Sequence, residues 1–182
     1  MHMGQNRIIV AKAALDDAQP IAELASTTFL ATFEKPFANY EADLAAYLAR
    51  TFSAEKLAES IAKPGNCYWI ARDEAGPVGY AKLKLGSGHP LLPFDGAAQL
   101  QKIYVHDRAI GGGVGLSLVE KVLEEASSRG AEDLWLSVYQ SNDRARRFYE
   151  RLGWRDFGSD QFAIGQLVLD YRIMARKLRL RK

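Results

Sequence analysis

The stretch IYVHDRAIGGGVGLSLVEKVLEEA, residues 103–126, decides the fold of this chain. Its first three residues, Ile103 to Val105, suit a β-strand, and from Val114 onward apolar residues recur at helical spacing. Between them stand Gly111, Gly112, Gly113 and Gly115. Glycines adopt positive φ and let backbone approach a ligand, so several N–H groups can point into one concavity where the helix begins. The stretch therefore predicts a strand, an anion-binding loop and a helix.

The spacing of the glycines excludes two common nucleotide loops. Counted from Gly111, a Rossmann GxGxxG pattern would need a third glycine where Leu116 stands, and no lysine follows the glycines at P-loop spacing. A helix N-terminus stabilises a nearby negative charge by about 0.3–1 kcal/mol. A diphosphate would then be held mainly by the backbone.

A second stretch, LSVYQSNDRARRFYERLGW, residues 136–154, has the pattern of a strand followed by a short helix. Asn142 suits the position that caps this helix, which we expect to run from Asp143 to about Leu152. The helix carries the aromatic pair Phe148 and Tyr149. A phenol is thus expected near the glycine loop.

With both stretches in place, the chain resembles the GCN5-related N-acetyltransferases, whose R/QxxGxG/A loop binds coenzyme A. Gly113 and Gly115 match its GxG, whereas Ile110, Gly112 and Asp107 depart from the usual Arg or Gln, Lys and Pro. The later signature matches at Leu136, Val138, Asn142, Ala145, Phe148, Tyr149, Gly153 and Trp154. The resemblance covers residues 66–178, and the helices before it are similar to those of bacterial polyamine acetyltransferases.

The resemblance implies an α/β (α+β) fold, with a mixed, mostly antiparallel sheet of six to seven strands and helices on both faces. With 182 residues, 48% of them hydrophobic and 25% charged, we expect one domain over residues 1–182. The predicted strands are 8–13, 67–72, 78–85, 98–105, 133–139, 154–158 and 166–178, and the predicted helices are 17–33, 40–49, 54–62, 114–126 and 143–152. Asp16 or Asp17 is the expected cap of the first helix, and residues 86–97 form a loop that can overhang a site.

The same resemblance implies that acetyl-CoA is the co-substrate, with its pantetheine arm between the fourth and fifth strands. The residues expected to bind the coenzyme are Ile103, Tyr104, Val105, Ile110, Gly111, Gly112, Gly113, Val114, Gly115, Leu116, Asn142, Ala145 and Phe148. Tyr149 stands where the family places the general acid for the departing thiolate, and a backbone N–H near Val105 is the expected oxyanion donor. One of the arginines 144, 146, 147 and 151 is a further candidate for a coenzyme phosphate.

An alkyl amine with a pKa near 10.4 costs about 4.6 kcal/mol to present neutral at pH 7, so a base or a desolvating pocket is needed. Gln99 and Gln101 stand where relatives often place a glutamate base, which leaves a water relay or another carboxylate. The residues predicted to line the acceptor site are Phe29, Phe33, Tyr40, Gln99 and Gln101, with Glu34, Glu41 and Asp43 to attract a cation. The acceptors considered are polyamines, small primary amines, antibiotics, and protein N-termini or lysines, in that order.

Composition argues against other partners. The net charge of +2 predicts neither a nucleic acid nor a membrane as partner. The single cysteine, Cys67, falls in a strand pattern and reads as a buried apolar residue; His2, His89 and His106 form no metal-ligand pattern, so no metal is expected. No signal peptide is evident, so the expected location is the cytoplasm.

A homodimer is compatible with the sequence. Two alternative functions stay open: a non-catalytic acyl-CoA sensor, and a nucleic-acid-binding or adaptor protein that uses the basic tail from Arg172 to Lys182.

Overall fold

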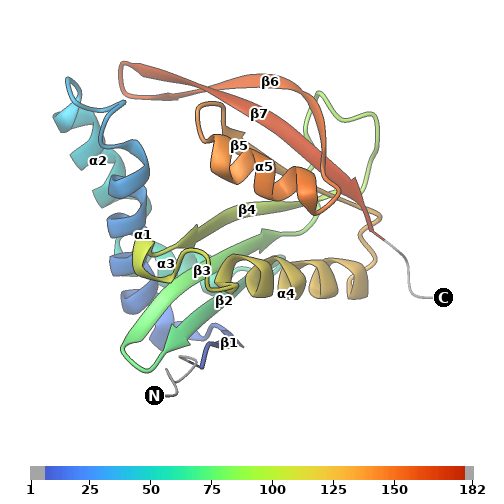
Figure 1. Cartoon of the computed structure of the whole chain (residues 1–182), viewed down its shortest axis with the longest axis horizontal. Coiled ribbons are helices and arrows are strands. Elements are labelled where there is room, and N and C mark those ends of the chain that lie inside the picture. The colour runs from blue at the N-terminus through green and yellow to red at the C-terminus, as the bar shows by residue number, and fades with distance from the viewer. Residues whose placement is uncertain (1–6, 179–182) are drawn as a thin grey trace.

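The computed structural model describes residues 7–178, and a seven-stranded sheet with the order β1-β2-β3-β4-β5-β7-β6 runs through its middle (Figure 1). The strands are Ile9–Lys12 (β1), Asn66–Asp73 (β2), Gly76–Lys84 (β3), Ala98–Val105 (β4), Asp133–Tyr139 (β5), Arg155–Ile164 (β6) and Leu167–Lys177 (β7). Every neighbouring pair is antiparallel except β4 and β5, which are parallel. The predicted mixed, mostly antiparallel sheet is confirmed.

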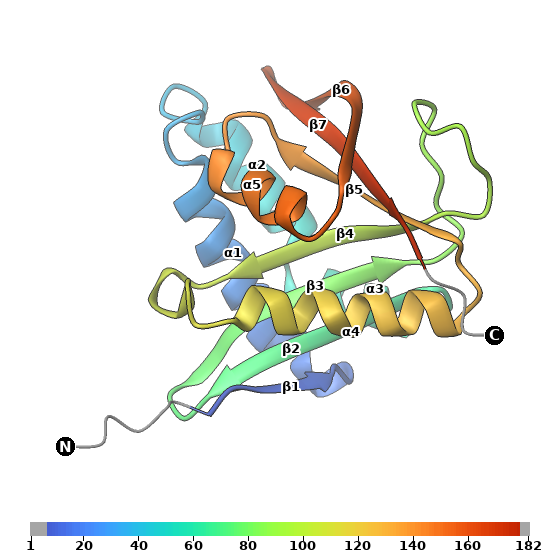
Figure 2. The same ribbon diagram turned by 45° about the vertical axis from the view of Figure 1, so that its right-hand side comes forward.

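Helices cover both faces of the sheet, as predicted (Figure 2). One face carries α1 (Ala18–Phe33), α2 (Glu41–Thr51) and α3 (Ala54–Ala62); the other carries α4 (Val114–Ser128) and α5 (Asp143–Arg151). Strand residues alternate between the two cores. On β3, Ala81 and Leu83 join the core under α4, whereas Tyr80 joins the core under α1.

One local prediction was wrong and another is confirmed only in part. The strand expected to end at Gly158 continues to Ile164, because Gly158, with φ 130°, lies at a register shift against β7 and marks a bulge within the strand. Asp17 occupies the N-cap position of α1, as predicted, but its carboxylate makes no capping hydrogen bond: it accepts a hydrogen bond from the Ala14 N–H at 2.8 Å and pairs with Arg72. A 3₁₀ turn over Leu15–Asp17 leads directly into the helix, so Asp17 already has helical backbone angles.

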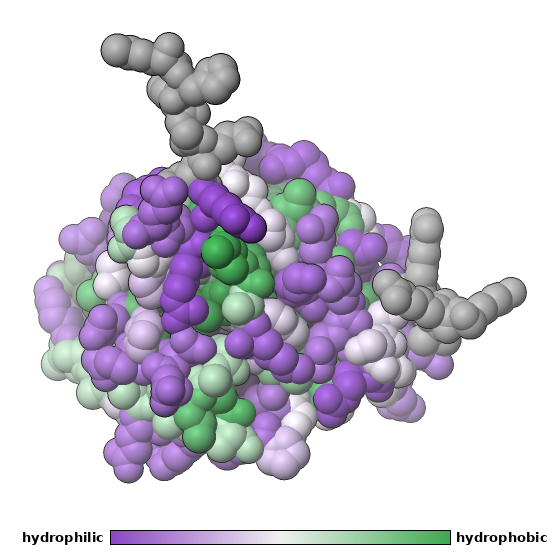
Figure 3. Space-filling model, turned by 90° about the horizontal axis from the view of Figure 1, so that it is seen from below, coloured by the Kyte–Doolittle hydropathy of each residue, from purple (hydrophilic) through white to green (hydrophobic). Residues whose placement is uncertain are grey.

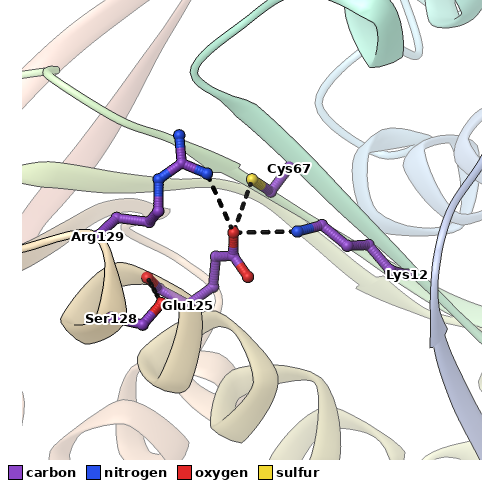
Figure 4. Close-up of polar contacts among 5 residues, drawn as sticks. All are labelled: Lys12, Cys67, Glu125, Ser128 and Arg129. Atoms are coloured by element: carbon purple, nitrogen blue, oxygen red, sulfur yellow. Dashed lines mark hydrogen bonds and ion pairs between the residues drawn. The ribbon is translucent and has the colours of Figure 1, made fainter.

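A polar cluster around Glu125 ties β1 and β2 to α4 (Figure 4). Its Oε1 lies 3.0 Å from Lys12 Nζ and 3.5 Å from both Arg129 Nη1 and Cys67 Sγ. Burial and the Glu125 carboxylate raise the pKa of the Cys67 thiol, so the thiol stays protonated. Cys67 is buried, as the sequence predicted, and it lines neither of the cavities described below.

The face shown in Figure 3 carries apolar residues in small groups separated by hydrophilic ones. Within residues 7–178, no helix has both the length and the apolar character that crossing a membrane requires. The structure is of a single chain and does not test the homodimer with which the sequence is compatible, so the homodimer stays a prediction.

Leu118 on α4 is fully buried between that helix and the sheet. We expect Leu118→Ala to lower the free energy of unfolding by about 2–5 kcal/mol, because the substitution removes buried methyl groups and leaves a cavity. Leu30, which is 40% exposed on α1, is the control, and its substitution by alanine should cost about 0.5 kcal/mol or less. Urea unfolding measures both; similar losses at the two positions would contradict the packing described.

Candidate active site

The site lies where β4 and β5 separate (Figure 2). These parallel strands pair only at Ala98 with Leu134 and at Gln99 with Trp135. Beyond those pairs the facing backbone groups of both strands have no neighbouring strand, and a cavity of about 480 Å³ opens between them. A ligand in this cavity can therefore hydrogen-bond to free main-chain groups.

The glycine loop closes one end of this first cavity. Gly111 and Gly113 adopt φ values of 85° and 82°, which a residue with a side chain rarely does, and Gly113 leads into α4. The first N–H groups of α4 have no partner within the helix and carry its positive dipole end. The loop therefore has the geometry that anion binding requires. The N–H of Gly112 is already used, because it donates a hydrogen bond to Ala109 O at 3.2 Å.

The structure brings together most of the residues predicted to bind the coenzyme. The first cavity is lined by Ile103, Tyr104, Val105, Ile110, Gly111, Gly113, Gly115, Leu116, Asn142, Ala145 and Phe148, together with Tyr149. Two predicted residues, Gly112 and Val114, do not line it; the Val114 side chain is buried in the core under α4. Coenzyme contact itself stays a prediction for the whole set.

Tyr149 lies on α5 with its ring edge-on to Phe148 and Trp154, and only 6% of the residue is exposed. Burial raises its pKa well above the ordinary phenol value, and no hydrogen bond to another described residue opposes that rise. The hydroxyl therefore stays protonated at neutral pH and is available as a donor in the first cavity.

Asn142 caps α5 as predicted: its side-chain oxygen accepts a hydrogen bond from Ala145 N at 3.1 Å. Of the four arginines on this helix, Arg144 and Arg151 line the first cavity, whereas Arg146 pairs with Asp143 at 3.2 Å. The lining of this cavity therefore contains two arginines and, among the described residues, no carboxylate.

A second cavity, of about 620 Å³, lies on the other side of the gap, under α1, α2 and α3. The two cavities share Gln101, Lys102, Tyr104, Ser137 and Tyr171 as lining residues. Of the residues predicted for the acceptor site, Phe29, Gln99 and Gln101 line the second cavity. Phe33 lines the first cavity instead, and Tyr40 lines neither.

The acidic groups predicted to attract a cation do not reach either cavity. Glu34, Glu41 and Asp43 are absent from both linings, and the Asp43 carboxylate accepts a hydrogen bond from Gln166 N at 3.0 Å. The loop 86–97, which was expected to overhang a site, borders the second cavity. His89 from this loop lines the second cavity and lies 2.9 Å from Asp160 of β6.

Two lysines in the second cavity, Lys82 and Lys102, were not among the predicted site residues. A register shift in the β3–β4 pairing leaves Gln101 as an extra residue, so Gln99 and Lys102 face the same side although their numbers differ by three. Strict alternation would have placed Lys102 on the other face of the sheet. The only sequence signal was two lysines in the middle of apolar strands.

Burial lowers the pKa of Lys82 and of Lys102 to about 8, and for Lys82 the charge of Lys102 adds to the effect. Neither ammonium pairs with a carboxylate of residues 7–178: Lys82 Nζ lies 5.4 Å from the ring centre of Tyr68, and Lys102 Nζ lies 5.3 Å from that of Phe52. The second cavity is therefore a cationic, partly desolvated space.

Comparison with known proteins agrees with this geometry. Residues 21–154 match the acetyltransferase (GNAT) family. An uncharacterised N-acetyltransferase of Mycobacterium tuberculosis is 31% identical over 164 residues, which cover 90% of this chain and 99% of that protein. Another, from Lactobacillus delbrueckii, is 27% identical over 82% of this chain and 85% of its own length.

Solved structures share the fold. A GCN5-related N-acetyltransferase of Rhodopseudomonas palustris superposes with a TM-score of 0.72 at 22% identity, over 98% of this chain and 100% of that one. The PaiA N-acetyltransferase of Thermoplasma acidophilum, solved with coenzyme A, superposes with a TM-score of 0.68 at 18% identity, over 94% and 99%.

The Lys102 pKa leads to a stability prediction. Because the folded-state pKa is about 8 and the unfolded value is near 10.5, the unfolded chain binds more protons between these values, and this lysine makes stability rise with pH there. Lys102→Met removes the penalty of the buried charge, so we expect it to stabilise the protein more at pH 7 than at pH 9.5. Urea unfolding at both pH values, with exposed Lys84→Met as control, measures the difference. An equal effect at both pH values would show that Lys102 carries no such penalty.

Proposed function

This chain belongs to the acetyltransferase (GNAT) family, and on that premise we propose that it transfers the acetyl group of acetyl-CoA to a primary amine in a ternary complex. The observation that carries the proposal is the gap between β4 and β5, where two cavities meet over five shared residues. One cavity suits a long anionic thioester and the other a smaller amine. A thioester at the junction would then face the amine without any covalent intermediate on the protein.

We place the coenzyme diphosphate at the glycine loop, where free N–H groups and the α4 dipole can hold it. The pantetheine arm would run along β4 beyond Gln99 and pair with the free main-chain groups there. Arg144 and Arg151 would contact coenzyme phosphates at the cavity mouth. Such backbone contacts would allow the loop to bind a diphosphate although Ile110 and Gly112 replace the Arg or Gln and the Lys that the family usually has there.

In the reaction, the lone pair of the amine nitrogen attacks the thioester carbonyl carbon, and a tetrahedral oxyanion forms. A main-chain N–H near Val105 would stabilise this charge. The carbon–sulfur bond then breaks, the nitrogen loses a proton, and the products are an amide and the free thiol of coenzyme A. Two like charges nearby disfavour a protonated amine, so Lys82 and Lys102 would help to present the amine in its neutral, nucleophilic form.

Tyr149 is the proposed acid for the leaving thiolate. A thiol near pKa 8.5 is more acidic than a phenol whose pKa burial has raised above 10, so complete transfer from Tyr149 alone is uphill. Tyr149 would therefore act first as a hydrogen-bond donor that stabilises the developing thiolate. The proton released by the amine balances the final protonation of the thiol.

Tyr149→Phe removes this donor and keeps the ring packing against Phe148 and Trp154. We expect turnover to fall by about 10² or more, with little change in acetyl-CoA affinity. Release of free coenzyme A thiol measures turnover, and calorimetry measures affinity. Unchanged turnover would exclude Tyr149 as the acid, and acetyl-CoA binding without turnover of any amine by the native protein would favour the sensor function.

Gly113→Val tests the coenzyme loop, because φ at this position is 82° and the substitution distorts the loop that leads into α4. We expect loss of acetyl-CoA binding in calorimetry. Gly130→Val is the matched control: φ at Gly130 is 78°, so the backbone strain is similar, but Gly130 follows α4 and lines neither cavity. If both variants fold and both keep or both lose binding, the loop assignment is wrong.

A further inference from the structure

The second cavity contains two positively charged lysines on neighbouring strands. Lys82 on β3 and Lys102 on β4 are directly opposite in the antiparallel register, and both line the second cavity. Like charges in such cross-strand positions destabilise a sheet, and burial adds to the cost. A bound anion between the two ammonium groups would remove this repulsion.

A buried tyrosine on the same face of β3 has a hydroxyl without a partner in the described structure. Tyr80 occupies the same face of β3 as Lys82, two residues earlier, and also lines the second cavity. It is 1% exposed, its ring stacks on Tyr104 with centroids 5.9 Å apart, and its hydroxyl makes no hydrogen bond within the described structure. Leaving a buried hydroxyl unsatisfied is unfavourable, so a ligand oxygen that reaches it would be bound favourably.

The other charged residues of the cavity do not cancel the two lysines. Arg50 and Lys56 are also in the lining, and Lys56 pairs with Glu59. The one carboxylate in the lining, Asp160, already pairs with His89. The cavity therefore has an excess of positive charge, which disfavours the polyamines that the sequence suggested.

We propose that the acceptor is an amine that also carries a carboxylate, as an amino acid does, and that Lys82, Lys102 and Tyr80 bind this carboxylate. The inference rests on the proposed acetyl transfer and specifies its substrate class. Lys102 lies at the junction of the two cavities, so a carboxylate held there leaves an α-amine within the same region. The aromatic residues Tyr47, Phe52 and Tyr68 line the same cavity and favour an apolar side chain on the substrate.

The test compares each amino acid with its decarboxylated amine and its amide: phenylalanine with phenethylamine and phenylalaninamide, tryptophan with tryptamine and tryptophanamide, and lysine with cadaverine and lysinamide. Release of free thiol from acetyl-CoA gives kcat/KM. We expect each acid to exceed both partners by at least about tenfold. The amides control for basicity. Their α-amines are less basic than those of the acids, so a larger fraction is neutral and reactive, but they lack the carboxylate; a preference for the acids therefore cannot come from amine basicity.

Lys82→Met and Lys102→Met should remove this preference: the ratio of kcat/KM for each acid to kcat/KM for its decarboxylated amine should fall about tenfold or more, and this ratio cancels any effect of the lysines on amine protonation. Lys84→Met is the matched control, since Lys84 is exposed at the end of the same strand and lines neither cavity. Its preference should equal that of the native protein. Should either methionine variant fail to fold, the glutamine variant at the same position replaces it.

A second readout does not depend on turnover. With coenzyme A present, calorimetry should show N-acetylphenylalanine binding at least about tenfold more tightly than N-acetylphenethylamine, and the lysine variants should lose the difference. Equal affinity for the two products, or a preference of the native protein for cadaverine over lysine, would overturn the inference. If acetyl-CoA itself fails to bind and no amine releases thiol, the proposed acetyl transfer is wrong; turnover confined to amines without a carboxylate rejects the substrate class alone.

Discussion

The separation of β4 from β5 is the constraint on which the rest of the site depends. Parallel strands normally continue their ladder along their length, but here the ladder ends after Gln99 and Trp135. The cost is a set of main-chain donors and acceptors without protein partners, in the middle of the sheet. Helix α5 and the glycine loop border the opening on one face, and α1, α2 and α3 border it on the other. The fold thus leaves a cavity on each face of the sheet at this opening, and the two cavities share a wall.

The two cavities are positive for different reasons. At the glycine loop, the charge comes mainly from main-chain N–H groups and the dipole of α4, which are fixed in place by the backbone. In the second cavity it comes from Lys82 and Lys102, whose ammonium groups are partly desolvated and lie near aromatic rings. The first arrangement suits a diphosphate, and the second suits a small anionic group. The same physical effect, a positive potential in a low-dielectric space, is therefore built from backbone in one case and from side chains in the other.

The sequence allowed prediction wherever local chemistry determines structure. Glycine clustering placed the loop before α4, the Asn142 cap placed the start of α5, and periodicity placed most strands within a residue or two. Prediction failed where a bulge changes the alternation of a strand. Gly158 was expected to end a strand that continues past it, and the extra residue Gln101 meant that the sequence did not show on which face of the sheet Lys102 lies. Bulges depend on pairing with a neighbouring strand, which a single sequence does not display. The acceptor-side aromatics were hard to place for another reason, because a single sequence does not show how a helix is rotated against the sheet. Phe33 lies one helical turn after Phe29 on α1, yet Phe29 lines the second cavity and Phe33 lines the first; Tyr40 precedes α2 and lines neither.

Gln101, Lys102, Tyr104, Ser137 and Tyr171 belong to the walls of both cavities. A molecule in one cavity can therefore contact residues that also line the other, and the two binding free energies can be linked through these residues. Such linkage is reciprocal: whatever factor the first ligand contributes to the affinity of the second, the second contributes to that of the first. Cooperativity between the ligands of the two cavities would then follow from the shared wall alone, without a separate regulatory site.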